Sequence, residues 1–292
     1  MSELNYFHVD VFANQAYSGN GLAVFLDTDN WPTEFMQTLT QEKQQFESVF
    51  LSQVEVRNPF QAHARIFTVE EELPFAGHPI LGAAAVLHRT RARDALECCW
   101  TIHLNSRSIA VRSKNLGDHF ECEMNQGQAH LGAPLHHADV DAVLQRLGLT
   151  QADLRSDLKP QVISTGLDYL ILPIHSTAID RVVFHGDDLE SELAKLQAKF
   201  VFILDIEKRE IRTWDNAGKV EDIATGSAAG PAAAFLYEHG LAQADQTVQI
   251  QQGRFRQRPS NLRVAKNAQG EILVSGGVWG ISAGYLEARP RH

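Results

Sequence analysis

The residue of this chain best suited to acid–base chemistry is Glu47. It stands in the run Phe46-Glu47-Ser48-Val49-Phe50, with apolar residues on both sides. Burial among such neighbours would raise the pKa of its carboxyl group toward the range in which it moves protons near neutral pH. A glutamate in a strand is more often a solvated edge residue, so the pattern alone leaves both interpretations open.

Two short runs place glycine and a polar side chain at the start of apolar, alanine-rich segments. They are Gly77-His78, followed by residues 79–88, and Gly226-Ser227, followed by a helix that Gly240 would end. A helix that is apolar on every side is typical of a buried helix, and strands wrapped around it would bury it. Its first N–H groups and partial positive charge would hold a carboxylate. The alternative is that glycine and serine only cap each helix.

Two further polar residues each have a chemical and a structural interpretation. A lone histidine usually caps or packs, but the position of His78 beside Gly77 favours a role as proton partner or as a donor to substrate. Asp222 precedes an Ile-Ala-Thr-Gly turn and could simply satisfy local N–H groups. The histidines elsewhere show no spacing with carboxylates or thiols that would predict a metal site.

The elements that carry these residues occur twice in the chain. Gly77–His88 aligns with Gly226–Tyr237, at an offset of 149 residues in a chain of 292. Three other landmarks keep the same order at similar offsets: Arg65–Phe67 with Arg212–Trp214, Val49–Leu51 with Val201–Ile203, and Gly21-Leu22 with Gly166-Leu167. A period this long predicts two similar domains that face each other across a cleft.

The alternation of apolar residues predicts similar elements in both halves. Strands are expected at 6–12, 22–26, 48–54, 169–174 and 200–204, and helices at 32–44, 79–88 and 188–198. In each half a strand and a turn then lead into the most apolar helix.

Composition excludes several classes of function. The net charge of −10 gives no basic surface for nucleic acid. The first residues lack a targeting pattern and no later stretch is apolar enough to span a membrane, so we expect a cytoplasmic protein without membrane contact. Three cysteines, Cys98, Cys99 and Cys122, form neither a disulfide framework nor a metal pair.

Four fragments, taken in order, resemble the PhzF family of phenazine-biosynthesis isomerases and their relatives. They are Val9–Phe12 with Gly19-Asn20, Glu47–Phe50, Glu72–Pro79 and Glu221–Ala228. Gly253, Arg258-Pro259-Ser260 and Gly276-Gly277 fall where the family carries glycines and an Arg-Pro pair. The chain departs from the family at Gly21, Val69 and Gln257, which indicates a divergent branch and leaves the substrate open.

This resemblance implies the diaminopimelate epimerase fold, an α+β protein of two similar domains related by a pseudo-twofold axis. Each domain is a barrel-like sheet around a central helix. With the duplication, it predicts domains at residues 1–128 and 129–278, with a last strand, about 279–292, that returns to the first domain. It also implies a homodimer that needs no metal and no cofactor.

The resemblance also assigns roles residue by residue. Glu47 falls on the acid/base glutamate of the family, and His78 and Asp222 fall on the catalytic histidine and aspartate of its substrate site. The helix-start residues that contact the ligand correspond to Gly77, Gly226 and Ser227.

The activity implied is isomerisation of a small carboxylate similar to trans-2,3-dihydro-3-hydroxyanthranilate, with one glutamate moving a proton between carbons in the interdomain cleft. An amino-acid epimerase or racemase of the same fold is the first alternative. Those relatives use a cysteine at each helix start, and residues 74–77 and 222–226 contain none. The second alternative is a catalytically silent binding protein, which the presence of all three catalytic residues disfavours.

Overall fold

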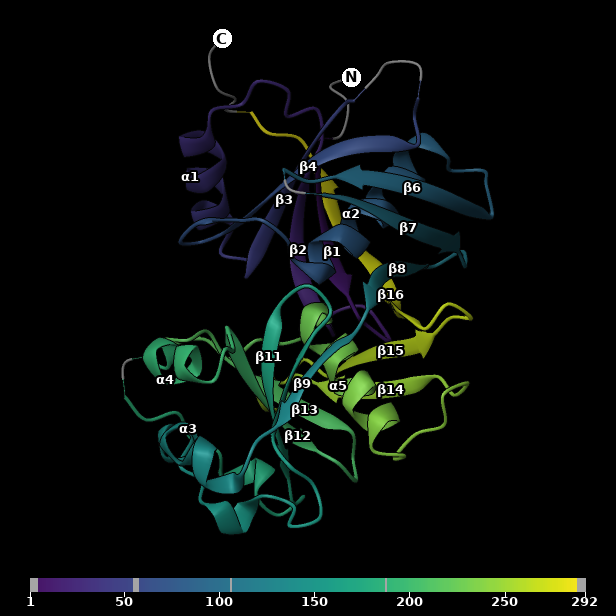
Figure 1. The fold of residues 1–292 in the computed structure, drawn as a ribbon. Coiled ribbons are helices and arrows are strands. Elements are labelled where there is room, and N and C mark those ends of the chain that lie inside the picture. The colour runs from purple at the N-terminus through teal and green to yellow at the C-terminus, as the bar shows by residue number, and fades with distance from the viewer. Residues whose placement is uncertain (1–4, 55–57, 106, 187, 288–292) are drawn as a thin grey trace. The chain divides into compact units, whose positions relative to one another are not determined.

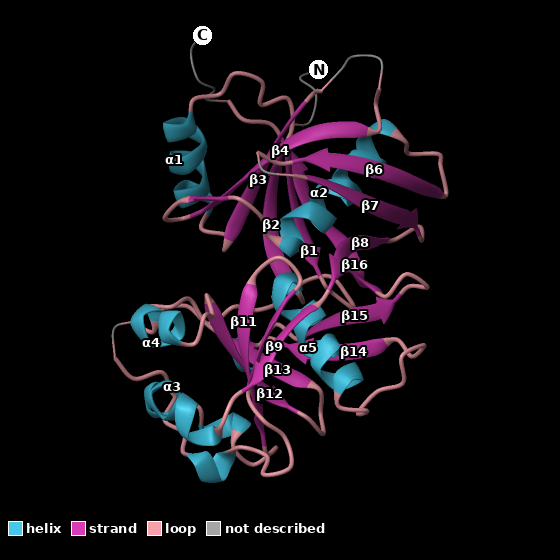
Figure 2. Cartoon of the chain, in the orientation of Figure 1, coloured by secondary structure: helices cyan, strands magenta, loops and turns pink. Residues whose placement is uncertain are grey.

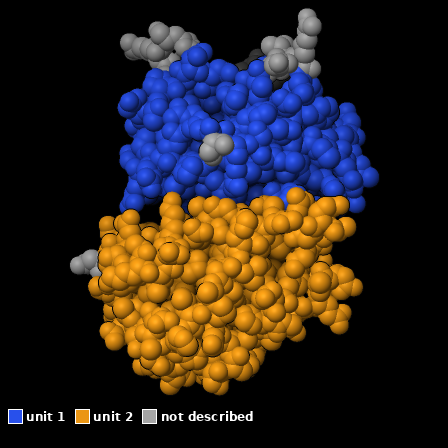
Figure 3. Space-filling model, in the orientation of Figure 1, with its two compact units in different colours: residues 1–125, 275–292 blue, residues 126–274 orange. Residues whose placement is uncertain are grey.

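The computed structural model describes residues 5–54, 58–105, 107–186 and 188–287. Residues 1–4, and residues 288–292 at the end of the strand expected to return to the first domain, lie outside the described residues. The chain divides into two compact units: unit 1 is Met1–Asn125 with Ser275–His292, and unit 2 is Gln126–Val274 (Figure 3). The domain limits that the sequence analysis placed at residues 128 and 278 remain a prediction.

Unit 1 is a mixed sheet whose strand order closes on itself (Figure 1). The order is β1-β2-β3-β4-β6-β7-β8-β16, and residues Val278–Gly284 of β16 pair again with β1. The strands are β1 (Tyr6–Val11), β2 (Asn20–Phe25), β3 (Glu47–Ser52), β4 (Gln61–Thr68), β5 (Glu72–Leu73), β6 (Glu97–His103), β7 (Ser108–Asn115), β8 (Phe120–Gln128) and β16 (Glu271–Gly284). β8 and β16 each contribute residues to both units.

The central helix of unit 1 is α2 (Gly77–Arg91), which contacts β1, β2, β3, β6 and β7. Every residue from Gly77 to His88 is buried, which confirms the buried helix expected at 79–88. Small residues permit this close packing, since a Cβ on Gly82 would lie 2.3 Å from the Leu22 side chain. The other helix, α1 (Thr33–Lys43), packs on β3 and β4 over an aromatic cluster that includes Phe25 and Phe50.

Unit 2 has its own run of paired strands and its own central helix (Figure 2). The strands are β9 (His130–Pro134), β10 (Gln161–Ser164), β11 (Asp168–Ile174), β12 (Phe200–Asp205), β13 (Glu210–Thr213), β14 (Val248–Gln252), β15 (Ser260–Lys266) and the first residues of β16. Helix α5 (Gly226–Glu238) contacts β10, β11, β14 and β15, and is buried from Gly226 to Tyr237. Two short helices, α3 (Asp141–Arg146) and α4 (Glu190–Lys195), cover a second apolar cluster.

The two units repeat one sequence of strand pairings. In unit 1, β1–β2 is antiparallel, β2–β3 parallel, β3–β4 antiparallel and β4–β6 parallel. In unit 2, β10–β11 is antiparallel, β11–β12 parallel, β12–β13 antiparallel and β13–β14 parallel. In both units, the central helix lies in the chain segment that connects the two strands of the second parallel pair. The backbone therefore repeats as the sequence landmarks predicted.

Three sequence expectations need correction. The helix expected at 188–198 covers only Glu190–Lys195, because Gln197 takes a left-handed φ of 58° and turns the chain toward β12. The strand expected at 48–54 begins at Glu47 and ends at Ser52. Gly21 and Gly166 are not equivalent, since Gly21 pairs with Asp10 inside β2, whereas Gly166 lies in the turn before β11 with φ 127°.

Candidate active site

Glu47 is held in the interior of the unit 1 sheet. It is the first residue of β3, where it lies opposite Leu22 of β2 and Thr68 of β4. Because β3 has a neighbour on each side, its residues cannot reach water across a strand edge. The exposed fraction of Glu47 is 5%, so the interpretation as a solvated edge residue is wrong.

His78 lies against the Glu47 carboxylate. It is the second residue of α2 and is 3% exposed. Its Nδ1 atom is 3.2 Å from Glu47 Oε2 and 3.5 Å from the Asn20 side-chain nitrogen. Its other ring nitrogen, Nε2, is buried and has no hydrogen-bond partner within the described ranges. The arrangement presents a ring nitrogen that a bound molecule could use.

Burial determines the charge of this histidine. Desolvation lowers the pKa of His78 from about 6.5 to about 3, so the imidazole is neutral near pH 7. A neutral ring carries one proton, on either nitrogen. If Nδ1 accepts from the Asn20 side-chain nitrogen, Nε2 carries the proton and is a donor; in the other tautomer Nε2 is an acceptor. The ring can therefore present either form to a substrate without placing a net positive charge in the core.

The helix starts beside these residues have no side-chain cap. The N-cap residue of α2 is Ala76, which has no side chain that could cap, and that of α5 is Thr225, which makes no capping hydrogen bond. The interpretation that glycine and serine only cap these helices is therefore wrong, because Gly77, Gly226 and Ser227 lie inside the first turns. The first N–H groups of a helix lack intrahelical acceptors, which makes both starts suited to an anion.

In unit 2, Asp222 explains why Thr225 does not cap its helix. Asp222 Oδ2 accepts a hydrogen bond from the Thr225 hydroxyl. Gln252 Nε2 donates to the Asp222 carbonyl at 3.0 Å and to the Thr225 hydroxyl oxygen at 2.9 Å, and Gln252 Oε1 accepts from the Thr225 N–H at 2.8 Å. The threonine hydroxyl is thus held away from the helix. Asp222 has the local turn role that the sequence allowed, and a catalytic role for it stays a prediction.

Ser227 belongs to a buried polar group around the start of α5. Its hydroxyl lies 2.8 Å from the Tyr169 hydroxyl on β11, and Ser227 is 9% exposed. The carbonyl of Gly226 accepts a hydrogen bond of 3.0 Å from Gln126, whose oxygen accepts one of 2.8 Å from Thr165. These bonds fix the first turn of α5 in one position.

The structure groups the predicted residues by unit. Glu47, Gly77 and His78 come together in unit 1, and the other three come together in unit 2: Asp222, Gly226 and Ser227. Sequence reasoning did not assign three polar partners: Asn20, Tyr169 and Gln252. Asn20 stood in a fragment that carried the family resemblance, whereas nothing in the sequence distinguished Tyr169 or Gln252.

The described residues offer neither a metal site nor a membrane-spanning helix. Across residues 5–54, 58–105, 107–186 and 188–287, no group of three or more His, Cys, Asp or Glu side chains could hold a metal ion. No helix within those ranges is long and apolar enough to cross a membrane.

The fold defines the class of protein first. A solved structure of a hydroxyproline epimerase from Agrobacterium vitis is 10% identical, covers 96% of this chain and 91% of its own, and has a TM-score of 0.61. At this identity the likeness shows the fold alone, which is the diaminopimelate epimerase fold, as the sequence predicted.

More similar proteins define the family. The family model of phenazine biosynthesis-like proteins (PhzC-PhzF) matches residues 9–277. Trans-2,3-dihydro-3-hydroxyanthranilate isomerase of Pseudomonas aeruginosa is 30% identical over 97% of this chain and 98% of its own. A structure described as a predicted epimerase from Pseudomonas aeruginosa is 46% identical, covers 98% of this chain and 100% of its own, and has a TM-score of 0.92. The chain belongs to the PhzF family and is an isomerase.

Proposed function

We propose that this isomerase moves a proton between two carbons of a small cyclic carboxylate similar to trans-2,3-dihydro-3-hydroxyanthranilate. The observation that carries the proposal is the contact of 3.2 Å between Glu47 Oε2 and His78 Nδ1, both buried, at an uncapped helix start. Glu47 takes a proton from one carbon and returns it to another, so that atoms and charge balance. A positioned acid/base group of this kind contributes about 10²- to 10⁴-fold to the rate.

The starts of α2 and α5 supply the groups that would hold the substrate. We propose that the amides of Gly77, Gly226 and Ser227 contact the substrate, because neither helix start is capped by its own side chains. Asp222 keeps its proposed catalytic role beside them. No metal or cofactor enters this scheme. A homodimer in the cytoplasm remains the expected setting, which light scattering and fractionation of the source cells would test.

The test is turnover of trans-2,3-dihydro-3-hydroxyanthranilate in deuterated water, followed by NMR. Wild type should isomerise it and exchange deuterium into the product. Glu47→Gln keeps the shape and a polar group but cannot exchange a proton, so kcat should fall by about 10² or more while binding persists. The control is Glu123→Gln, a glutamate on β8 that lies 3.8 Å from Arg112.

Two outcomes would contradict the proposal. If Glu47→Gln kept full activity, another base would be required. If a thiol-alkylating reagent abolished wild-type activity, the two-thiol epimerase would replace it. The second outcome is not expected, because Cys98 and Cys122 are buried and burial raises the pKa of both thiols. The exposed Cys99 lies on β6 and at neither helix start, so its alkylation should leave activity intact.

A further inference from the structure

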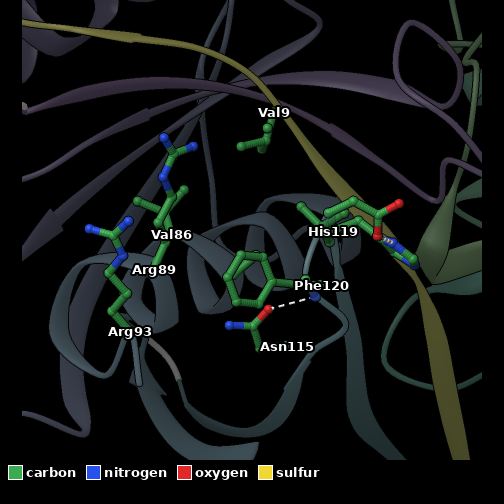
Figure 4. Close-up of a pocket in the computed structure, with 12 residues that line it drawn as sticks. Val9, Val86, Arg89, Arg93, Asn115, His119 and Phe120 are labelled. Atoms are coloured by element: carbon green, nitrogen blue, oxygen red, sulfur yellow. Dashed lines mark hydrogen bonds and ion pairs between the residues drawn. The ribbon is translucent and has the colours of Figure 1, made fainter. Parts of the chain in front are cut away.

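Unit 1 contains a pocket at the other end of α2 from His78. Its volume is about 310 Å³, within the range of small-molecule sites. The residues that line it all belong to unit 1: Val9, Ala85, Val86, Arg89, Arg93, Asn115, Gly117, Asp118, His119, Phe120, Val278 and Gly280 (Figure 4). Residues 78 and 89 are about 16 Å apart along the helix, at 1.5 Å per residue. The pocket is therefore separate from the candidate active site.

Two arginines give this pocket positive charge. Arg89 and Arg93 are exposed, and within the described ranges neither has a carboxylate oxygen within 4.0 Å. Other arginines of the chain, such as Arg155 and Arg254, are bonded to carboxylates. The one acidic side chain of the pocket, Asp118, already accepts a hydrogen bond of 2.6 Å from His119 Nδ1. In a chain of net charge −10, these two arginines bring positive charge to the pocket, and Arg89 also lies over the Phe7 ring, 5.6 Å from its centroid.

The floor of the pocket is apolar. Val9, Val86 and Val278 line it and are 4%, 1% and 1% exposed. The ring of Phe120 forms one wall, beside Asn115 (Figure 4). Asn115 Oδ1 accepts a hydrogen bond of 2.9 Å from the Gly117 N–H, so its amide nitrogen keeps two hydrogens for donation. The side chains thus combine donors for an anion with a surface for a hydrocarbon body.

We propose that this pocket binds a small organic carboxylate, with the carboxylate on Arg89 and Arg93 and the apolar body over the valines. Guanidinium groups match a carboxylate in geometry and charge. The partial negative charge at the end of α2 opposes an anion, but it is about half a charge against two full positive charges. Inorganic phosphate would satisfy the arginines and leave the apolar floor uncovered, so the composition of the pocket favours an organic anion.

The test uses benzoate as the probe and two-dimensional amide NMR as the readout. Benzoate should shift the side-chain amide of Asn115 and the backbone amides of Gly117 and Gly280. In Arg89→Gln/Arg93→Gln, which removes both charges, Kd should rise about tenfold or more. The matched control is Arg112→Gln, an arginine 63% exposed on β7 outside the pocket, which should bind as wild type does.

Neutral and inorganic probes distinguish the parts of the proposal. Benzyl alcohol should bind more weakly than benzoate, and inorganic phosphate should also bind more weakly. Equal binding of either, an unchanged Kd in the double variant, or shifts at Gly77 and Gly226 instead of at the pocket would overturn the proposal. If the double variant failed to fold, Arg93→Gln alone and the comparison of the three probes on wild type would still decide it.

Discussion

The starts of α2 and α5 stand at equivalent places in the repeated pairing pattern, yet they carry different chemistry. At α2 an ionisable pair, Glu47 and His78, lies in contact at 3.2 Å. At α5 the corresponding turn carries two hydroxyls in contact at 2.8 Å, those of Ser227 and Tyr169. A pair that exchanges protons suits catalysis, and a pair of hydroxyls suits binding. The comparison indicates that both copies kept the uncapped helix start, while the side chains beside it diverged.

A second pair of repeated residues differs in burial instead of chemistry. Arg65 and Glu72 form a two-pronged ion pair in unit 1, with bonds of 2.8 and 2.6 Å. Arg212 and Glu221 form the same pair in unit 2, with bonds of 2.7 and 2.9 Å. The side chains of the first pair are 29% and 24% exposed, and those of the second are 8% and 11% exposed. One Arg–Glu ion pair thus stabilises the segment before each central helix, and this pair is partly exposed in unit 1 and buried in unit 2.

The largest predicted effect concerns these ion pairs. Arg212→Met leaves the Glu221 carboxylate buried without its partner, and it removes the donor to the carbonyls of Ile179 and Val182. Breaking a buried pair should lower the free energy of unfolding by about 3–5 kcal/mol. Arg65→Met should cost about 1 kcal/mol or less, because water replaces the lost contacts. Urea unfolding of both variants measures the difference, and equal losses would mean that burial does not separate the two copies.

The next effect concerns the two nitrogens of His78. His78→Asn places an amide where Nδ1 contacts Glu47, and His78→Gln places one nearer the position of Nε2. If Nε2 contacts the substrate, both variants should lose activity. The loss should be about 10²-fold in His78→Asn, which keeps only the contact with Glu47. Steady-state kinetics on trans-2,3-dihydro-3-hydroxyanthranilate, with His130→Asn as an exposed control, tests this. Full activity of His78→Asn would show that only the Nδ1 contact matters.

The pKa of His78 also predicts a dependence of stability on pH. Its pKa is lowered to about 3 in the folded state, so between pH 3 and 6.5 the unfolded state binds more protons at this residue. Stability from this residue is therefore full above pH 6.5 and falls as the pH drops toward 3. Between pH 7 and 5, the free energy of unfolding should therefore fall less in His78→Asn than in wild type, by a difference on the order of 1–2 kcal/mol. Parallel slopes in wild type and variant would contradict the buried neutral state.

The smallest effect concerns the hydroxyl pair at α5. Ser227→Ala should raise KM by about tenfold if Ser227 contacts the substrate, since it removes that donor. Tyr169→Phe removes only the supporting hydroxyl and should raise KM by less. The values of kcat should change little in either variant, in contrast to the variants at α2. A larger effect of Tyr169→Phe would assign the substrate contact to the tyrosine.

The sequence predicted the repeat and both central helices because their signal is local: small apolar residues over three turns, with glycine before them. It also predicted Glu47, His78 and the helix-start residues through motif resemblance. It did not predict the partners Tyr169 and Gln252, which lie 58 and 27 residues from the groups that they contact. A contact of that kind depends on strand register, and a single sequence does not determine register. Helix 188–198 was too long for a similar reason, because the turn at Gln197 follows from the position of β12.

The sheet of unit 1 closes only when its last strand, β16, has been synthesised and pairs with β1. Val278–Gly284 of β16 pairs with β1, and it is made after every residue of unit 2. At roughly 5–20 residues per second, a ribosome needs on the order of ten seconds to add the residues from 126 to 284. During that time the side of β1 that will receive β16 is an open strand edge, of the kind that pairs with other chains. The nascent protein therefore passes through an interval in which unit 2 can fold while unit 1 waits for its final strand.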